Sequence, residues 1–274
     1  MLSEDMRREG KRADDDKWTI GLVLNDVSTD YAREVIRNVK NALLFNETIR
    51  LIVIAGKYED ETFPDVNVRE YKKIYNSIFQ LVELCDIEGL IITKSDWRNL
   101  ENRICDHNPA SKLRSIPKVF IGSHIEDGTT VTYDNEAGIR DAVDLLINVN
   151  GFSKLCMLGG REGNHDAIER KEIFVKCLLD NGIEFGENAY VSTDMTGDCI
   201  PEAELLLNRN PDVQAIFCVN DAVAKGLYAA MKKRGLMPGK DIKIFGFDNT
   251  RMSGEMEPPL ASIGPVEVTS GQKA

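Results

Sequence analysis

The sequence predicts an α/β fold made of two units, each a parallel sheet flanked by helices. Short apolar segments of buried-strand type alternate with longer segments whose apolar residues recur at three- and four-residue spacing. Strands that alternate with helices in this way form parallel sheets. The alternation continues for roughly 240 residues, which is more than one small doubly wound domain needs. A single (β/α)₈ barrel fits the composition equally well and is the alternative architecture.

The expected elements follow one another in regular order. In the first helical segment Ala32, Val35, Ile36 and Val39 share one face, as in an amphipathic helix. The expected strands cover residues 18–24, 51–54, 89–93, 119–121, 154–158, 215–218 and 242–245, with an extended segment at 130–133. The expected helices cover residues 32–43, 71–84, 99–106, 137–146, 166–179 and 222–233.

Asp134 marks the expected crossing between the two units. The hydrophobic alternation restarts there after the extended segment, and an aspartate suits the N-cap of the helix that follows. Residues 1–16 precede the first strand, and ten of these sixteen residues are charged. We expect this leader to be disordered, and it has no apolar centre of the kind that a secretory signal requires.

Charge and composition exclude several classes of protein. The net charge of −11 repels phosphate backbones and anionic membranes, so we expect these residues to contact neither nucleic acid nor membrane. No apolar run reaches the ~18 residues of a transmembrane helix. The six cysteines are scattered without a C-x-x-C pair, which indicates buried free thiols in a cytoplasmic protein rather than disulfides or a zinc site.

Catalytic and cofactor motifs are absent from the sequence. It contains no G-x-x-x-x-G-K-[ST], G-x-G-x-x-G, H-E-x-x-H or G-x-S-x-G motif. His107, His124 and His165 are dispersed, and none has metal-ligand spacing with another. We therefore expect no enzyme activity, no cofactor and no metal. The segment 159–164, GGREGN, is either an anion-binding loop or a tight strand-to-helix turn, and its spacing matches no phosphate fingerprint.

Polar residues follow several expected strands, at the edge where open parallel sheets bind ligands. These residues are 26–31, 159–164, 220–221 and 248–250, with Arg170 one turn into the helix after the second group. Together they form a hydrogen-bonding rim that suits a hydroxyl-rich solute such as a sugar or nucleoside. Taken singly, each is also interpretable as a helix cap, a turn residue or a surface ion-pair partner. Tyr31, Trp97 or Phe247 would offer an aromatic platform for a sugar ring, or pack in the interior.

Four stretches resemble the effector domains of the lactose-repressor (LacI/GalR) family. The most specific is AIFCVNDAVAKGLYAAMKKRGLMPGKDIKIFGFDNTRMSGEMEPPLASI, and the others are IGLVLNDVSTDYAREVIRNVKNA, VTYDNEAGIRDAVDLLI and GGREGNHDAIERKEIFVKCLLDNGI. The resemblance spans about residues 17–264 and implies the type I periplasmic-binding-protein fold, in which crossing strands join two Rossmann-like subdomains around a cleft. On this basis residues 17–134 and 264–274 form the N-terminal subdomain, and residues 135–263 form the C-terminal subdomain.

The resemblance also implies a binding site and a partner. Arg170, Asn220 and Asp248 match the arginine, asparagine and aspartate that hold the ligand in the family, and Asp30 with Tyr31 matches the wall of the N-terminal subdomain. Asn164 and Trp97 follow strands at the same edge and complete the expected ligand-binding set. The expected ligand is a carbohydrate or nucleoside, and the expected assembly is a homodimer formed through helices of the N-terminal subdomain.

Two departures from the family shape the functional hypothesis. The leader is too short for the family's helix-turn-helix headpiece, and the chain stops where the family continues with a further helix and strands. We therefore expect a sensor module whose cleft closure signals to an output domain outside these residues, such as a GGDEF-class diguanylate cyclase or a histidine kinase. The alternative is the effector domain of a LacI-family transcriptional regulator. Less favoured are a transport-associated periplasmic protein and a small α/β enzyme that acts on a sugar through Asp26, Asp134 or Asp248.

Overall fold

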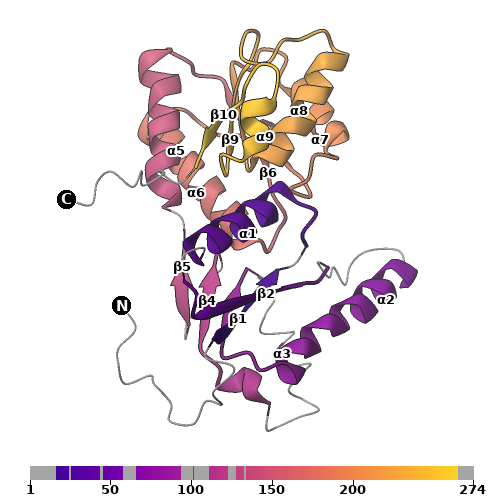
Figure 1. Ribbon diagram of the computed structural model, residues 1–274. Helices are drawn as coiled ribbons and strands as arrows, with labels where there is room; N and C mark the ends of the chain where they lie inside the picture. The colour runs from indigo at the N-terminus through magenta and orange to yellow at the C-terminus, as the bar shows by residue number, and fades with distance from the viewer. Residues whose placement is uncertain are drawn as a thin grey trace, which may run out of the picture. The chain divides into compact units, whose positions relative to one another are not determined.

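The computed structural model describes residues 17–24, 26–43, 46–57, 66–93, 101, 111–122, 128–132 and 134–264 (Figure 1). The chain divides into two compact units, Met1–Val131 and Thr132–Ala274, which we call the N-terminal and C-terminal units. Each unit holds one five-stranded parallel sheet. The predicted α/β class is therefore confirmed. The single-barrel alternative is wrong, because the strands form two separate sheets and not one closed ring.

The sheet of the N-terminal unit has the order β2-β1-β3-β4-β5. Its strands are β1 (Trp18–Leu24), β2 (Ile49–Ala55), β3 (Gly89–Ile92), β4 (Lys118–Ile121) and β5 (Thr129–Val131). The described helices of this unit include α1 (Asp30–Leu43), α2 (Val66–Tyr75) and α3 (Leu81–Leu84).

Strand β1 is mostly apolar because both of its faces are buried. Leu22 and Leu24 pack with Val35 of α1 on one face of the sheet. Val23 points to the other face and packs in a cluster with Phe79 and Val82. Phe79 lies in the short 3-10 helix before α3, and Val82 lies in α3. Successive residues of a strand point to opposite faces, so helices on both sides require a continuous apolar run.

The sheet of the C-terminal unit has the order β10-β9-β8-β6-β7. Its strands are β6 (Leu155–Gly159), β7 (Tyr190–Ser192), β8 (Ala215–Cys218), β9 (Lys243–Phe247) and β10 (Ala261–Ile263). Its α-helices are α5 (Asn135–Asp144), α6 (His165–Asp180), α7 (Ile200–Arg209), α8 (Asp221–Lys233) and α9 (Arg251–Glu255). In Figure 1, α5 and α6 lie together on one side of this sheet, and α7 and α8 lie on the other.

Aromatic rings and thiols fill the core of the C-terminal unit. The Phe217 and Phe245 rings stack with their centroids 4.7 Å apart, and Phe174 lies 5.3 Å from Phe217. Burial raises the pKa of Cys156 to about 12 and that of Cys199 to about 11, so both stay protonated thiols. The prediction of free thiols is confirmed for the cysteines that the structure describes: Cys85, Cys156, Cys177, Cys199 and Cys218.

Four strands and α-helices of the C-terminal unit were not predicted: β7, β10, α7 and α9. The strands β7 and β10 have three residues each, too few to show a hydrophobic period. Helix α7 buries Ala203, Leu206 and Leu207, a helical spacing that is present in the sequence but was overlooked, and α9 has only five residues. The expected helix at 99–106 lies outside the described residues apart from Glu101, as do the leader 1–16 and residues 265–274. In the described part of the chain, no helix has both the length and the apolar character needed to span a bilayer.

Candidate functional site

The polar residues of the C-terminal unit gather where β6, β8 and β9 end beside one another. Strand β6 pairs with β7 on one side and with β8 on the other, so the strand order reverses between β6 and β8. Open parallel sheets bind their ligands outside the carboxyl ends of the strands at such a reversal. Asn164 follows β6, Asn220 follows β8 and Asp248 follows β9.

Arg170 of α6 lies at the centre of this group and is 3% exposed. Its Nη2 lies 3.4 Å from Asp248 Oδ1, its Nη1 donates to the Val219 carbonyl at 2.8 Å, and its Nε donates to Asn135 Oδ1 at 3.2 Å. The guanidinium carbon lies 3.6 Å from the centroid of the Phe247 ring, in a cation–π contact. The arginine that the resemblance implies is thus held by bonds to three other segments of the C-terminal unit.

Asp248 faces Arg170 from a strained position of the chain. Its φ is 98° and that of Asn249 is 46°, both in the left-handed region that non-glycine residues seldom adopt. The Asp248 amide donates to the Ile263 carbonyl at 2.7 Å, which ties this turn to β10. Burial raises the pKa of Asp248 to about 7, with further upward contributions from Asp221 and Asp166, while the Arg170 charge opposes them.

Asp221 is a second buried carboxylate and has a structural role. Its Oδ2 accepts from the Thr250 amide at 2.8 Å and the Thr250 hydroxyl at 2.9 Å, and its Oδ1 accepts from the Ser262 hydroxyl. Burial raises its pKa, against these hydrogen bonds and the charge of Arg170. Asp221 therefore joins the start of α8 to the turn after β9 and to β10, and so holds Asp248 in place.

Gly246 leaves room for Asp221. A Cβ added at Gly246 would lie 2.4 Å from Asp221 Oδ1 and 3.0 Å from Leu260 Cδ2. Three consecutive residues at the end of β9 thus have three separate roles. Gly246 allows the close approach of Asp221, the Phe247 ring packs against Arg170, and Asp248 places a carboxylate beside that arginine.

We expect Gly246→Ala to destabilise the C-terminal unit by about 1–3 kcal/mol, because the methyl group displaces a buried carboxylate and its hydrogen bonds. Urea unfolding measures this change. The control is Gly254→Ala in α9, where an added Cβ meets nothing within 4 Å, and we expect a change within about 0.5 kcal/mol there. Equal stability of the two variants would contradict the role of Gly246.

The two asparagines of the predicted site cap helices. The Asn164 side chain accepts from the Ala167 amide at 2.9 Å, and the Asn220 side chain accepts from the Val223 amide at 2.9 Å. Asn220 Nδ2 also donates to the Met195 carbonyl at 3.1 Å. The loop 159–164 forms a strand-to-helix turn, with Gly163 at φ 88° and Asn164 as the N-cap of α6, and anion binding by this loop stays a prediction.

The site residues expected from the N-terminal unit are described only in part. Asp30 begins α1 and pairs with Arg33 at 3.2 Å, with its side chain 44% exposed. Tyr31 packs against the cluster of Leu22, Leu24 and Val35. Trp97 lies outside the described residues. Phe247 is 2% exposed and has Arg170 stacked on it, so this ring is not an open platform for a sugar.

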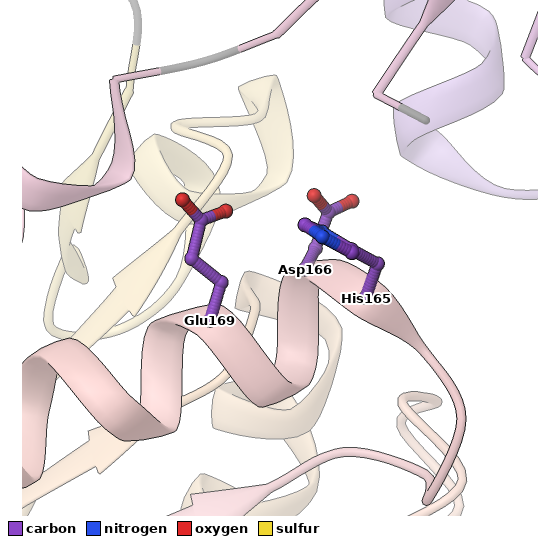
Figure 2. Close-up of side chains that lie close together, drawn as sticks. All are labelled: His165, Asp166 and Glu169. Atoms are coloured by element: carbon purple, nitrogen blue, oxygen red, sulfur yellow. The ribbon is translucent and has the colours of Figure 1, made fainter. Parts of the chain in front are cut away.

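Figure 2 shows that the side chains of His165, Asp166 and Glu169 rise from the same side of the first turns of α6. Their ligating atoms lie within 4.8 Å of one another, and an imidazole with two carboxylates is a donor set that a divalent cation accepts. Two features oppose a cation here. The N-terminus of a helix carries positive partial charge, and Glu169 Oε2 already accepts from Asn135 Nδ2 at 2.6 Å.

Asn135, Asp166 and Glu169 were not predicted as parts of this site. A signal for two of them is present in the sequence, because His165 is followed by acids at i+1 and i+4, which share one face of a helix. Asn135 lies on a different helix, and no local signal connects it to Arg170.

Comparisons with known proteins agree with the resemblance. Residues 143–274 match the family profile described as "Periplasmic binding protein-like domain". The chain is 24% identical to the "HTH-type transcriptional repressor PurR" of Vibrio atlanticus, over 93% of this chain and 72% of that protein. It is 30% identical to the "Probable HTH-type transcriptional repressor ExuR" of Bacillus subtilis, over 92% of this chain and 71% of that protein.

The chain belongs to the LacI family of transcriptional regulators. Its fold is also similar to the solved structure of a "transcriptional regulator CelR-cellobiose complex", with a TM-score of 0.71 and 19% identity over 92% of this chain and 74% of that one. The two parallel sheets with their helices are the type I periplasmic-binding-protein-like fold that the resemblance implied.

These LacI-family relatives favour one of the two functional hypotheses over the other. They are transcriptional regulators, which supports an effector-binding domain of a regulator over a sensor fused to a signalling output. The expected link to diguanylate cyclases has no support in the comparisons. The relatives are regulators and not enzymes.

Proposed function

We propose that this LacI-family chain binds a small hydroxyl-rich effector, a carbohydrate or nucleoside, at the group around Arg170 and Asp248. Asn220 and Asn164 complete the site in the C-terminal unit. Asp30, Tyr31 and Trp97 are further proposed contacts on the strength of the resemblance. The proposed subdomains are residues 17–134 with 264–274, and residues 135–263.

The observation that carries the proposal is the Arg170–Asp248 pair at the carboxyl edge of the sheet. Only one oxygen of Asp248 is bonded to Arg170, and within the described residues no group hydrogen-bonds the other. A carboxylate oxygen accepts hydrogen bonds and a guanidinium N–H donates them, and this pair of groups matches two neighbouring hydroxyl groups. The similar fold of CelR, whose structure is a complex with cellobiose, supports the sugar class.

The proposed assembly and cellular role of the protein are based on its LacI-family relatives. Two solved structures of similar fold are the CelR–cellobiose complex and the Lac repressor dimer bound to operator and the anti-inducer ONPF. We propose that this chain acts likewise: as a homodimer in the cytoplasm, without catalysis, controlling transcription through a DNA-binding segment outside these residues. A transport-associated role and sugar chemistry at Asp26, Asp134 or Asp248 are not supported by these relatives.

A thermal-shift screen against monosaccharides, disaccharides, nucleosides and polyols tests the proposal. A ligand at about 100 times its Kd stabilises the fold by about 2.7 kcal/mol, which is a measurable shift. We expect Asp248→Asn to weaken a hit at least tenfold, because the carboxylate acceptor is lost. Asp198→Asn, the same change at an exposed residue of the same unit, is the control and leaves the affinity unchanged.

Two results would contradict the proposal. One is the absence of any shift across the panel with a folded protein. The other is a hit whose affinity is equal in wild type, Asp248→Asn and Asp198→Asn, since this would place the ligand elsewhere.

A further inference from the structure

Among the described residues of the C-terminal unit, the proposed site has more carboxyl groups than basic groups around it. Asp166, Glu169, Asp221 and Asp248 all lie in the C-terminal unit around Arg170. Burial raises the pKa of Asp248 and that of Asp166, and neighbouring carboxylates add to both shifts: Asp221 and Asp166 for Asp248, and Glu169 for Asp166. One guanidinium therefore interacts with three carboxyl groups, Asp166, Asp221 and Asp248, and Glu169 adds a fourth beside Asp166.

The positive charge of Arg170 is already engaged by the protein. Each of its three nitrogens has a protein acceptor, and one face of the guanidinium lies on Phe247. Anionic ligands such as carboxylates and phosphates are bound best by two parallel N–H groups of an open guanidinium fork. Here three of the five N–H groups are directed at Asn135, Val219 and Asp248, so most donors of the guanidinium already serve the protein.

The N-terminus of α6 does not offer an anionic ligand a second positive site in place of Arg170. Asn164 already accepts from the Ala167 amide, one of the first N–H groups of α6. Asp166 stands in the first turn of the same helix and offsets the positive end of the helix dipole. Figure 2 shows the Asp166 and Glu169 carboxyl groups side by side above this turn.

We propose that this site selects its ligand by charge, accepting uncharged hydroxyl-rich solutes and rejecting the same solutes when they carry a carboxylate or phosphate. This inference rests on the proposed function and specifies its ligand class. A carboxylate accepts hydrogen bonds from neutral hydroxyls without penalty, whereas an anion entering beside Asp248, Asp166 and Glu169 meets like charge in a partly dehydrated site.

Matched pairs of ligands that differ only in charge test the inference. Glucose is compared with glucuronate, galactose with galacturonate, adenosine with AMP, and uridine with UMP, by thermal shift and then calorimetric titration at pH 8, where Asp248 is ionised. A chelator is present, because a cation on His165, Asp166 and Glu169 would reverse the local charge. We expect a neutral member to bind and its anionic twin to bind at least tenfold more weakly.

Variants that remove one charge each test whether Asp166 and Glu169 cause the preference for neutral over anionic ligands. We expect Asp166→Asn and Glu169→Gln each to reduce the neutral-to-anion ratio of affinities at least threefold. Glu172→Gln removes the same charge from an exposed position of the same helix and leaves the ratio unchanged. Two substitutions are used so that a folding defect in one does not leave the inference without a test.

Three results would overturn the inference. An anionic twin that binds wild type within threefold of its neutral partner contradicts it and leaves the proposed function intact. A ratio that neither variant changes assigns the discrimination to other residues. Absence of binding by every compound removes the proposed function and the inference together.

Discussion

Arg170→Met is expected to destabilise the C-terminal unit by about 3–5 kcal/mol at pH 8, because it leaves the Asp248 carboxylate buried without its partner. The substitution also removes the donors to the Val219 carbonyl and to Asn135. Methionine keeps most of the side-chain volume, so the loss reports charge and hydrogen bonds rather than a cavity. Urea unfolding followed by circular dichroism measures it. At pH 5.5 we expect a smaller cost, since Asp248 is then protonated.

Two further variants make this result interpretable. Arg251→Met removes an exposed arginine of the same unit that pairs with Glu255 at 2.7 Å, and we expect a change within about 0.5 kcal/mol. The double variant Arg170→Met with Asp248→Asn recovers part of the loss, because no unpaired charge remains. If Arg170→Met were as stable as Arg251→Met at pH 8, Arg170 would not be the partner of a buried charge.

The stability of the C-terminal unit is expected to fall as the pH rises from about 4 to about 7. The pKa of Asp248 is raised by burial to about 7 in the folded protein, so the folded chain keeps a proton that the unfolded chain releases near pH 4. Stability therefore decreases by up to about 1.4 kcal/mol per pH unit in this window from Asp248 alone. Burial also raises the pKa values of Asp166 and Asp221, which adds slope of the same sign.

Asp248→Asn tests this assignment without removing the side chain. Asparagine holds no titratable proton, and its amide oxygen still accepts from Arg170, so we expect a flatter pH profile and a stability at pH 7.5 no lower than that of wild type. Denaturant midpoints at half-unit pH steps provide the measurement. A wild-type profile that rises between pH 4 and pH 7, or one that Asp248→Asn reproduces, would show that Asp248 is ionised throughout this range.

Most of the architecture follows from local patterns in the chain. The buried strands β1, β6 and β8 are apolar runs bounded by polar turns, and each was predicted to within about a residue. Because these strands are parallel, their carboxyl ends share one edge, and the sequence therefore also indicated that the residues after β6, β8 and β9 lie together. The short edge strands β7 and β10 were missed, because three residues do not establish a period.

The functional hypothesis depended on observations of two kinds. The residues after the strands pointed to a polar solute, whereas the family resemblance supplied the roles of Arg170, Asn220 and Asp248. The short leader led us to favour a signalling fusion, but the length of a leader says nothing about what a binding domain controls. The relatives, which are transcriptional regulators, corrected that preference.

The sequence by itself determined the α/β class, the order of the strands along the chain, and the edge at which the polar residues meet. All three depend on hydrophobic periodicity and chain direction, which are local properties. The tertiary structure decided how those residues are used. It brought Asn135 from α5 to Arg170, laid Arg170 on Phe247, and placed Asp166 and Asp221 where their charges raise the pKa of Asp248. Hydrogen bonds and charge repulsion depend on distances between separate elements, and these distances exist only once the helices and the sheet have packed.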